Sequence, residues 1–192
     1  MGTRHLTIVY VNGEYKVAQY GQWDGYPEGA GAIILDFLKN EFVEDKFRKN
    51  LAKLRTIRTD EEREALNTLY GKHFPPEFSR DTGARILKMI QDDAVRSGFL
   101  AKSLDFAADS LFCEWAYVID LDKRMFEVYN GFNKEPLTKY DRFYFLRDQE
   151  SEQKYTDNDG KKSIVYHGIK LCASWSLADL PDYETFLAAC EE

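Results

Sequence analysis

The chain has 192 residues, a formal charge of −7 at pH 7, and fractions of 44% hydrophobic and 15% aromatic residues, which suit one domain with its own core. The acidic balance and the lack of a basic stripe argue against a nucleic-acid partner. The longest apolar runs are too short to span a bilayer, so we expect no membrane association.

The first predicted element is a β-hairpin. Two segments rich in β-branched and aromatic residues, LTIVYV at 6–11 and EYKVAQY at 14–20, flank Asn12-Gly13. This dipeptide is a strong turn signal because both of its positions tolerate a positive φ. The first strand is apolar on both faces, which predicts that it lies deep in a sheet covered on both sides.

A helical region follows the hairpin. Apolar residues recur there at helical spacing in three segments: Ile33, Ile34, Phe37 and Leu38; Val43, Phe47, Leu51 and Leu54; Ile86, Leu87, Ile90 and Val95. Thr59 opens a capping-box pattern that predicts a further helix, ended by Gly71. The last helix of the region is expected to begin at Asp81 or Thr82 and to end at Gly98.

The second half of the chain is rich in predicted strands. Four segments have the composition of strands: WAYVIDL at 115–121, MFEVY at 125–129, DRFYFLR at 141–147 and SIVYHGIKLCASWSL at 163–177. Asp122-Lys123 is a polar turn that pairs the first two. Residues 148–162 predict an exposed loop or hairpin tip, and a helix is expected from about Pro181 or Asp182.

This order of elements indicates an α+β protein with mostly antiparallel strands. We expect one α+β domain over residues 1–192. Its parts are a hairpin and a first helix (1–40), helices (41–100), antiparallel strands (101–177) and a final helix (178–192). Two arrangements would cover the first strand on both faces: a four-layer αββα sandwich, or a single sheet buried by helices and loops.

The corner between the first hairpin and the first helix, QYGQWDGYPEGAG at 19–31, is the strongest candidate for a site. One interpretation is a rigid turn in which Trp23 and Tyr26 are buried and Gln22 and Asp24 bond to the backbone. The other is a non-catalytic pocket lined by Gln19, Gln22, Trp23, Asp24 and Tyr26, whose amides and rings suit the recognition of a small polar molecule.

Two neighbouring residues extend this candidate site. Arg4 and His5 stand at the edge of the first strand and have the chemistry to face a ligand carboxylate or phosphate. The competing interpretation is that Arg4 pairs with an internal acid such as Asp24 or Glu28, because ion pairs are common and sites are few.

The remaining polar residues of the strands have simpler predicted roles. Glu114 lies in an apolar strand and needs a partner if it points inward, with Arg4 and Lys16 as candidates. Asp120 and Asp122 are expected to be solvated acids of a hairpin turn. A set of aromatic residues is assigned to the core: Trp115, Tyr117, Phe126, Tyr129, Phe143, Phe145 and Trp175.

Cysteine and histidine give no sign of a metal site or a cofactor. Cys113, Cys172 and Cys190 are odd in number and widely spaced, and no Cys/His pair has zinc spacing. Together with the lack of a signal peptide, this pattern predicts a reducing, cytoplasmic location. Each thiol is expected to fill space.

The opening of the chain resembles an uncharacterised family of fungal, bacterial and phage proteins. The residues that carry this resemblance are GTRHLT at 2–7, AQY at 18–20, QWDGYPEG at 22–29 and Gly31, together with YVIDLD at 117–122 and EVY at 127–129. The resemblance marks the corner as a family signature and implies no activity.

A weaker, topological resemblance is to the N-terminal-nucleophile hydrolases, whose fold is a four-layer sandwich. Gly2-Thr3 before the first strand is similar to their cleavage and nucleophile position. The resemblance implies an amide hydrolase in which Thr3 is the nucleophile and Lys16 or Asp24 tunes it. That chemistry needs a free amine on Thr3, which the preceding Met1-Gly2 would block.

The leading functional hypothesis is therefore binding without catalysis. The corner at 19–31 is rich in recognition groups and poor in reactive ones, so we expect it to bind a small polar molecule or a protein partner. The alternative is the Thr3 hydrolase. A secreted effector is a third interpretation, disfavoured by the lack of a signal segment.

Overall fold

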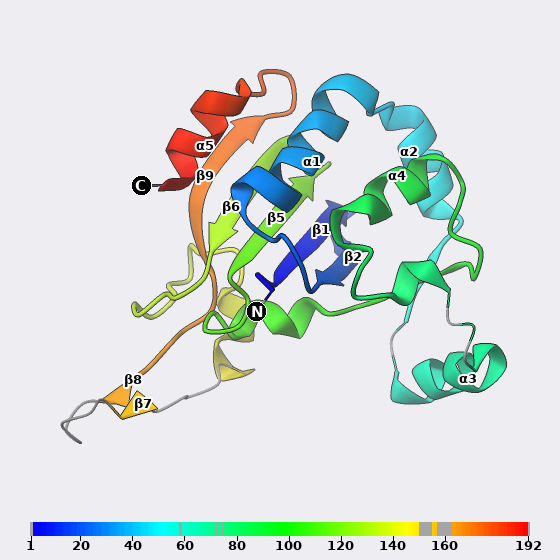
Figure 1. The fold of residues 1–192 in the computed structure, drawn as a ribbon, viewed down its shortest axis with the longest axis horizontal. Coiled ribbons are helices and arrows are strands. Elements are labelled where there is room, and N and C mark those ends of the chain that lie inside the picture. The colour runs from blue at the N-terminus through cyan, green and yellow to red at the C-terminus, as the bar shows by residue number, and fades with distance from the viewer. Residues whose placement is uncertain are drawn as a thin grey trace.

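The computed structural model describes residues 2–57, 59–71, 73, 75–149, 155–156 and 163–191. Its centre is a five-stranded sheet in the order β2-β1-β5-β6-β9 (Figure 1). The strands are β1 (His5–Val11), β2 (Glu14–Gly21), β5 (Trp115–Asp120), β6 (Met125–Asn130) and β9 (Lys170–Ser176). Only β1 and β5 pair in parallel among these neighbours, so the sheet is mostly antiparallel.

Five α-helices accompany the sheet in the described part of the chain. They are α1 (Ala32–Asp36), α2 (Glu44–Ala52), α3 (Asp60–Tyr70), α4 (Ile86–Gln91) and α5 (Tyr183–Glu191). Helical turns of other types span Pro27–Gly31, Phe37–Glu41, Pro76–Phe78, Gly83–Arg85, Leu104–Ala108 and Tyr144–Gln149. Short paired strands are β3 (Arg55–Thr56) with β4 (Phe99–Leu100) and β7 (Tyr155–Thr156) with β8 (Ser163–Ile164).

The sheet buries a separate core on each face. The larger core packs Val9 and Phe126 of the sheet against α1, α2, α4 and α5. The smaller core packs Leu6 and Ile8 against the turns at Leu104–Ala108 and Tyr144–Gln149. Strand β1 is therefore covered on both sides, as its two apolar faces predict.

The α+β class and the mostly antiparallel pairing are confirmed. Of the two arrangements expected for covering β1, the described residues form the single sheet buried by helices and loops. They contain no second large sheet to complete a four-layer sandwich.

The hairpin turn and the helix cap that short motifs predict are both present in the structure. Asn12 and Gly13 take φ of 54° and 77° at the tip of the first hairpin. The hydroxyl of Thr59 accepts a hydrogen bond from the Glu62 N–H, and the helix that it caps, α3, ends at Gly71 with φ of 50°. These signals depend on neighbouring residues only, which is why they can be interpreted without the fold.

Some predicted elements are wrong. The segment 141–147 contains part of the 3-10 helix Tyr144–Gln149 instead of a strand, and Phe145, assigned to the core, is 49% exposed. The helix expected to run to Gly98 ends at Gln91, after which Asp93 takes a positive φ. Most of the predicted loop at 148–162 lies outside the described residues.

A buried ionic network lies on the hairpin formed by β5 and β6. Arg142 donates from Nε to Glu127 Oε2 at 2.6 Å and from Nη2 to Glu127 Oε1 at 2.8 Å, and it also pairs with Asp120. Tyr129 Oη donates to Glu127 Oε2 at 2.8 Å. Burial raises the pKa of Tyr129, and the Glu127 carboxylate raises it further. The hydroxyl therefore stays a donor to that carboxylate.

This network corrects one sequence prediction. Asp120 was expected to be solvated, but its side chain is fully buried. Its Oδ1 accepts the backbone N–H groups of Asp122 and Lys123, and its Oδ2 pairs with Arg142. Asp122 is exposed as expected. It accepts the N–H groups of Asn12 and Gly13 from the other hairpin, each at 2.9 Å, which lowers its pKa.

Candidate functional site

The corner after β2 is fixed mainly by backbone hydrogen bonds. The Gly25 N–H donates to the Thr3 carbonyl at 3.0 Å, and the Ala30 N–H donates to the Asp24 carbonyl at 2.7 Å. The Tyr117 hydroxyl, from the centre of the sheet, donates to the Gly25 carbonyl at 2.8 Å. These contacts make the corner a rigid connection between the sheet and the helical turn that precedes α1.

Three glycines of different segments enclose the imidazole of His5, the first residue of β1. A Cβ added at Gly21 would lie 2.1 Å from His5 Cε1, and one added at Gly83 would lie 2.8 Å from His5 Nε2. A Cβ at Gly25 would lie 3.0 Å from His5 Nδ1. The ring therefore occupies a niche that larger residues at these positions would close.

The imidazole is buried without satisfying its hydrogen-bonding groups. His5 is 2% exposed, and neither ring nitrogen has a hydrogen-bond partner of ordinary geometry among the described residues. Burial lowers the pKa of His5 from 6.5 to about 4, against the opposing effects of the Asp24 carboxylate and the Thr3 backbone. His5 is thus neutral at pH 7, with one N–H donor and one nitrogen acceptor.

A cavity of about 380 Å³ opens beside this niche. It is lined by His5, Gly21, Trp23, Asp24, Ala30, Ile33, Arg80, Asp81, Thr82, Gly83, Ala84 and Arg85. Trp23 Nε1 donates to Asp81 Oδ1 at 2.8 Å, which ties the corner to the segment before α4. Arg85 donates to the Asp81 carbonyl and lies on the same rim. The cavity thus combines a neutral imidazole in its floor with charges of both signs at its mouth.

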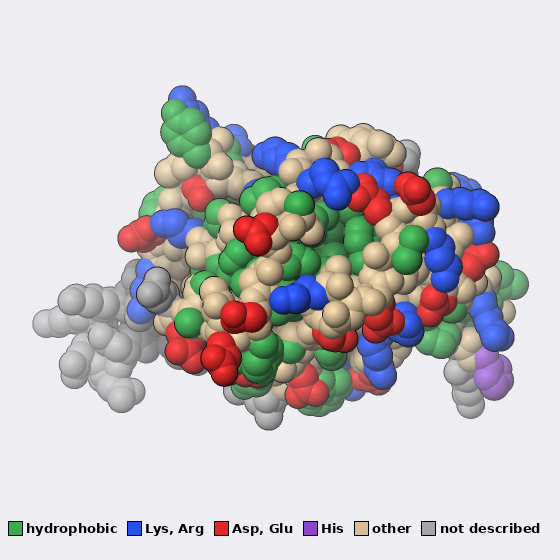
Figure 2. Space-filling model, turned by 90° about the horizontal axis from the view of Figure 1, so that it is seen from above, with side chains coloured by type: hydrophobic (Ala, Val, Ile, Leu, Met, Phe, Trp, Pro, Cys, Tyr) green, Lys and Arg blue, Asp and Glu red, His purple; other side chains and the backbone are tan. Residues whose placement is uncertain are grey.

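A broader groove of about 610 Å³ adjoins this cavity. Ile33, Ala84 and Arg85 line both, and the groove continues past Phe37 and Met89, between α1 and α4. Figure 2 shows this side of the molecule from above, with hydrophobic side chains in a hollow and charged side chains around it. A ligand that enters the His5 cavity therefore has an apolar surface next to it.

The residues predicted for the site do not all line the same cavity in the structure. Trp23 and Asp24 line the His5 cavity, whereas Gln19 lines a different one. Trp23 is 48% exposed and Tyr26 is 52% exposed, so the interpretation that buried both rings is wrong. Gln22 lines neither cavity, and its Oε1 accepts the Tyr20 hydroxyl at 2.7 Å.

Arg4 also lies outside both cavities. Its Nη2 is 3.6 Å from Glu114 Oε1, and its guanidinium lies 4.6 Å from the centroid of the Phe112 ring. This pairing confirms one of the two partners predicted for Glu114. It also confirms the interpretation that Arg4 pairs with an internal acid, although that acid is Glu114 and not Asp24 or Glu28. These contacts give Arg4 a structural role on the opposite side of β1.

The reactive groups proposed from the sequence are enclosed. Thr3 is 3% exposed, and its carbonyl accepts the Gly25 N–H. Its role as a nucleophile stays a prediction. Cys113 is fully buried, and burial raises its pKa well above the usual value, as expected for a packed thiol. Among the described residues, no group of three or more His, Cys, Asp or Glu side chains is arranged to hold a metal ion.

Sequence reasoning missed the segment Arg80–Arg85 as the second wall of the cavity. Its contacts with the corner join residues far apart in the chain, such as Trp23 and Asp81, and no local pattern encodes them. The available signal was Gly83 directly after Asp81-Thr82, a glycine in an expected helix start, which here takes φ of 46° beside His5.

Comparison of the chain with models of known protein families, with curated proteins and with solved structures found no match. The geometry of the described residues is therefore the basis for a functional proposal. One further finding bears on partners: no helix in the described part of the chain is long and apolar enough to cross a membrane.

Proposed function

We propose that this protein binds a small polar ligand, without catalysis, in the His5 cavity at the corner formed by residues 19–31. The observation that carries the proposal is the His5 imidazole beside a cavity of about 380 Å³. His5 is 2% exposed, and neither ring nitrogen has a hydrogen-bond partner of ordinary geometry among the described residues. A buried polar group without a partner costs about 1–3 kcal/mol, so its persistence calls for an explanation. A ligand that pairs with the imidazole supplies one.

The lining indicates the chemistry of the ligand. The neutral imidazole favours a ligand with one acceptor and one donor, and the exposed Trp23 ring offers a face for a planar group. Asp24 and Asp81 balance Arg80 and Arg85 at the mouth, so a neutral or zwitterionic ligand fits better than a strongly charged one.

Binding is favoured over catalysis by the groups present. The described lining residues include no serine, cysteine or lysine. Thr82 carries the hydroxyl found among these residues. That hydroxyl donates to the Pro76 carbonyl and is not free for nucleophilic attack.

A thermal-shift screen over nucleobases, neutral nucleosides and amino acids tests the proposal, because a ligand of the folded state raises the melting temperature. We expect Trp23→Ala to weaken the ligand found in this way by at least about 10-fold, through loss of the stacking face. Asp24→Asn is expected to weaken it as well. Asparagine is chosen because Asp24 has φ of 52°, which asparagine tolerates and alanine does not.

Tyr26→Ala is the matched control, since Tyr26 is an equally exposed aromatic residue of the same corner outside the cavity. It should leave both affinity and stability unchanged. If Trp23→Ala and Asp24→Asn unfold the protein, or if they bind the ligand as tightly as Tyr26→Ala, the corner is a structural turn and the proposal is wrong.

A further inference from the structure

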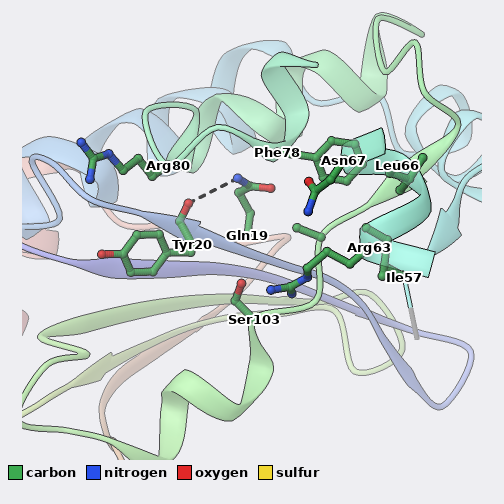
Figure 3. Close-up of a pocket in the computed structure, with 10 residues that line it drawn as sticks. Gln19, Tyr20, Ile57, Arg63, Leu66, Asn67, Phe78, Arg80 and Ser103 are labelled. Atoms are coloured by element: carbon green, nitrogen blue, oxygen red, sulfur yellow. Dashed lines mark hydrogen bonds between the residues drawn. The ribbon is translucent and has the colours of Figure 1, made fainter. Parts of the chain in front are cut away.

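A second cavity, of about 260 Å³, lies between the edge strand β2 and helix α3 (Figure 3). It is lined by Gln19, Tyr20, Ile57, Arg63, Leu66, Asn67, Phe78, Arg80, Ala101 and Ser103. Apart from Arg80 these residues do not line the His5 cavity. Its volume lies just below the usual ligand-pocket range of about 300–1,000 Å³, which restricts the occupant to a small molecule.

The charge of this lining is opposite to that of the chain. The protein carries a formal charge of −7, yet the described lining contains two arginines and no aspartate or glutamate. Arg63 forms no ion pair with the described side chains. Figure 3 shows its guanidinium directed toward Ser103, below the Gln19 side chain, whereas the guanidinium of Arg80 points away from the centre. A guanidinium that pairs with none of the described side chains, in a described lining without acidic residues, favours the binding of a ligand with a single anionic group.

Gln19 supplies an acceptor in a fixed orientation. It is 2% exposed, and its Nε2 donates to the Tyr20 and Ser79 carbonyls at 3.3 and 3.2 Å. These bonds hold the amide so that Oε1 points into the cavity, toward Asn67 (Figure 3). Because no carboxylate stands beside it in the described lining, this oxygen suits a neutral O–H or N–H donor better than an ammonium group.

The rest of the wall is apolar. Ile57 and Leu66 are buried, and the ring of Phe78 stands beside Asn67 in Figure 3. From these three features we propose that the cavity binds a small monocarboxylate that has a neutral hydroxyl or amide donor next to the carboxylate and an apolar body. The carboxylate pairs with Arg63, the donor pairs with Gln19 Oε1, and the body lies against Ile57, Leu66 and Phe78.

Isothermal titration calorimetry with 3-phenyllactate tests this site. Relative to that probe, 3-phenylpropionate lacks the hydroxyl and is expected to bind about 3- to 10-fold more weakly, the usual effect of one neutral hydrogen bond. Phenylalanine carries an ammonium in place of the hydroxyl and is expected to bind more weakly too. Inorganic phosphate has no apolar body and should not compete.

Arg63→Met is expected to weaken 3-phenyllactate about 10- to 100-fold, because it removes a charged hydrogen-bonding partner. Arg63→Lys keeps the charge and loses the fork, so we expect it to recover only part of the affinity. Arg96→Met is the control, since Arg96 is an exposed arginine outside the cavity. Arg63 is itself exposed, so both methionine variants should unfold at the same temperature as the unaltered protein.

Three outcomes would overturn the proposal: 3-phenyllactate does not bind, Arg63→Met binds it as tightly as Arg96→Met, or phosphate competes with it. The last would make the cavity a general anion site. Trp23→Ala should leave 3-phenyllactate binding unchanged, which separates this result from success or failure of the ligand proposed for the His5 cavity.

Discussion

Replacing Arg142 with methionine is expected to lower the free energy of unfolding by about 3–5 kcal/mol. The guanidinium side chain is only 11% exposed and pairs with the carboxylates of Asp120 and Glu127, which are 0% and 11% exposed. Its removal leaves two buried carboxylates close together without a counter-charge. The loss of stability therefore arises from the two buried carboxylates left without a partner. It is larger than the net contribution of the ion pairs to the free energy of unfolding.

Urea unfolding at pH 7 measures this effect. Arg124→Met is the control, because Arg124 pairs with Glu44 but is 56% exposed, and its loss should cost no more than about 1 kcal/mol. Arg142→Lys should recover little, since lysine cannot make the two parallel bonds to Glu127. Equal losses in Arg142→Met and Arg124→Met would show that the network adds no more than a surface ion pair.

Acidification from pH 6.5 to pH 4 is expected to remove about 3 kcal/mol of stability through His5 alone. Burial holds the pKa of His5 at about 4 in the folded protein, against 6.5 in the unfolded chain. Between these values the unfolded chain binds the proton and the folded protein does not. Stability is therefore complete above pH 6.5, falls as the pH is lowered through this interval, and changes no further below about pH 4.

Urea unfolding at half-unit pH steps measures the loss. Because carboxylates also titrate at low pH, the informative quantity is the difference between the unaltered protein and His5→Gln, in which the slope between pH 6.5 and 4 should shrink. His73→Gln, at an exposed histidine, should keep the slope. An NMR titration of the imidazole that placed the pKa of His5 near 6.5 would contradict the expectation directly.

Much of the fold could be predicted because its signals are local. Asn12-Gly13, the Thr59 cap and the apolar character of both faces of β1 act within a few residues, and each corresponds to the structure. The segment 141–147 shows the limit of such signals. Its aromatic composition resembles a strand, but Arg142 pairs with Asp120 of β5 and Glu127 of β6, and the chain then forms a 3-10 helix.

The candidate site could be predicted only in part. The corner carries an unusual composition, which was sufficient to select Trp23 and Asp24. The opposite wall, from Arg80 to Arg85, meets the corner through a contact between residues 58 positions apart, Trp23 and Asp81. Asp120 was assigned to solvent for the same reason, since its partner Arg142 is 22 positions away. Such pairings are set by the packing of the sheet and have no signature in a short window.

The parallel pairing of β1 with β5 has a consequence for the order of folding. The turn of the first hairpin and Asp122, which binds it, are 110 residues apart, so β1 has no neighbour on one edge until β5 has been synthesised. At a ribosome this edge would stay open for several seconds, at about 5–20 residues per second. A long apolar strand with an open edge attracts other chains. We therefore expect nascent chains truncated before residue 115 to remain bound to chaperones. Chains long enough to include β5 and β6 are expected to dissociate from the chaperones.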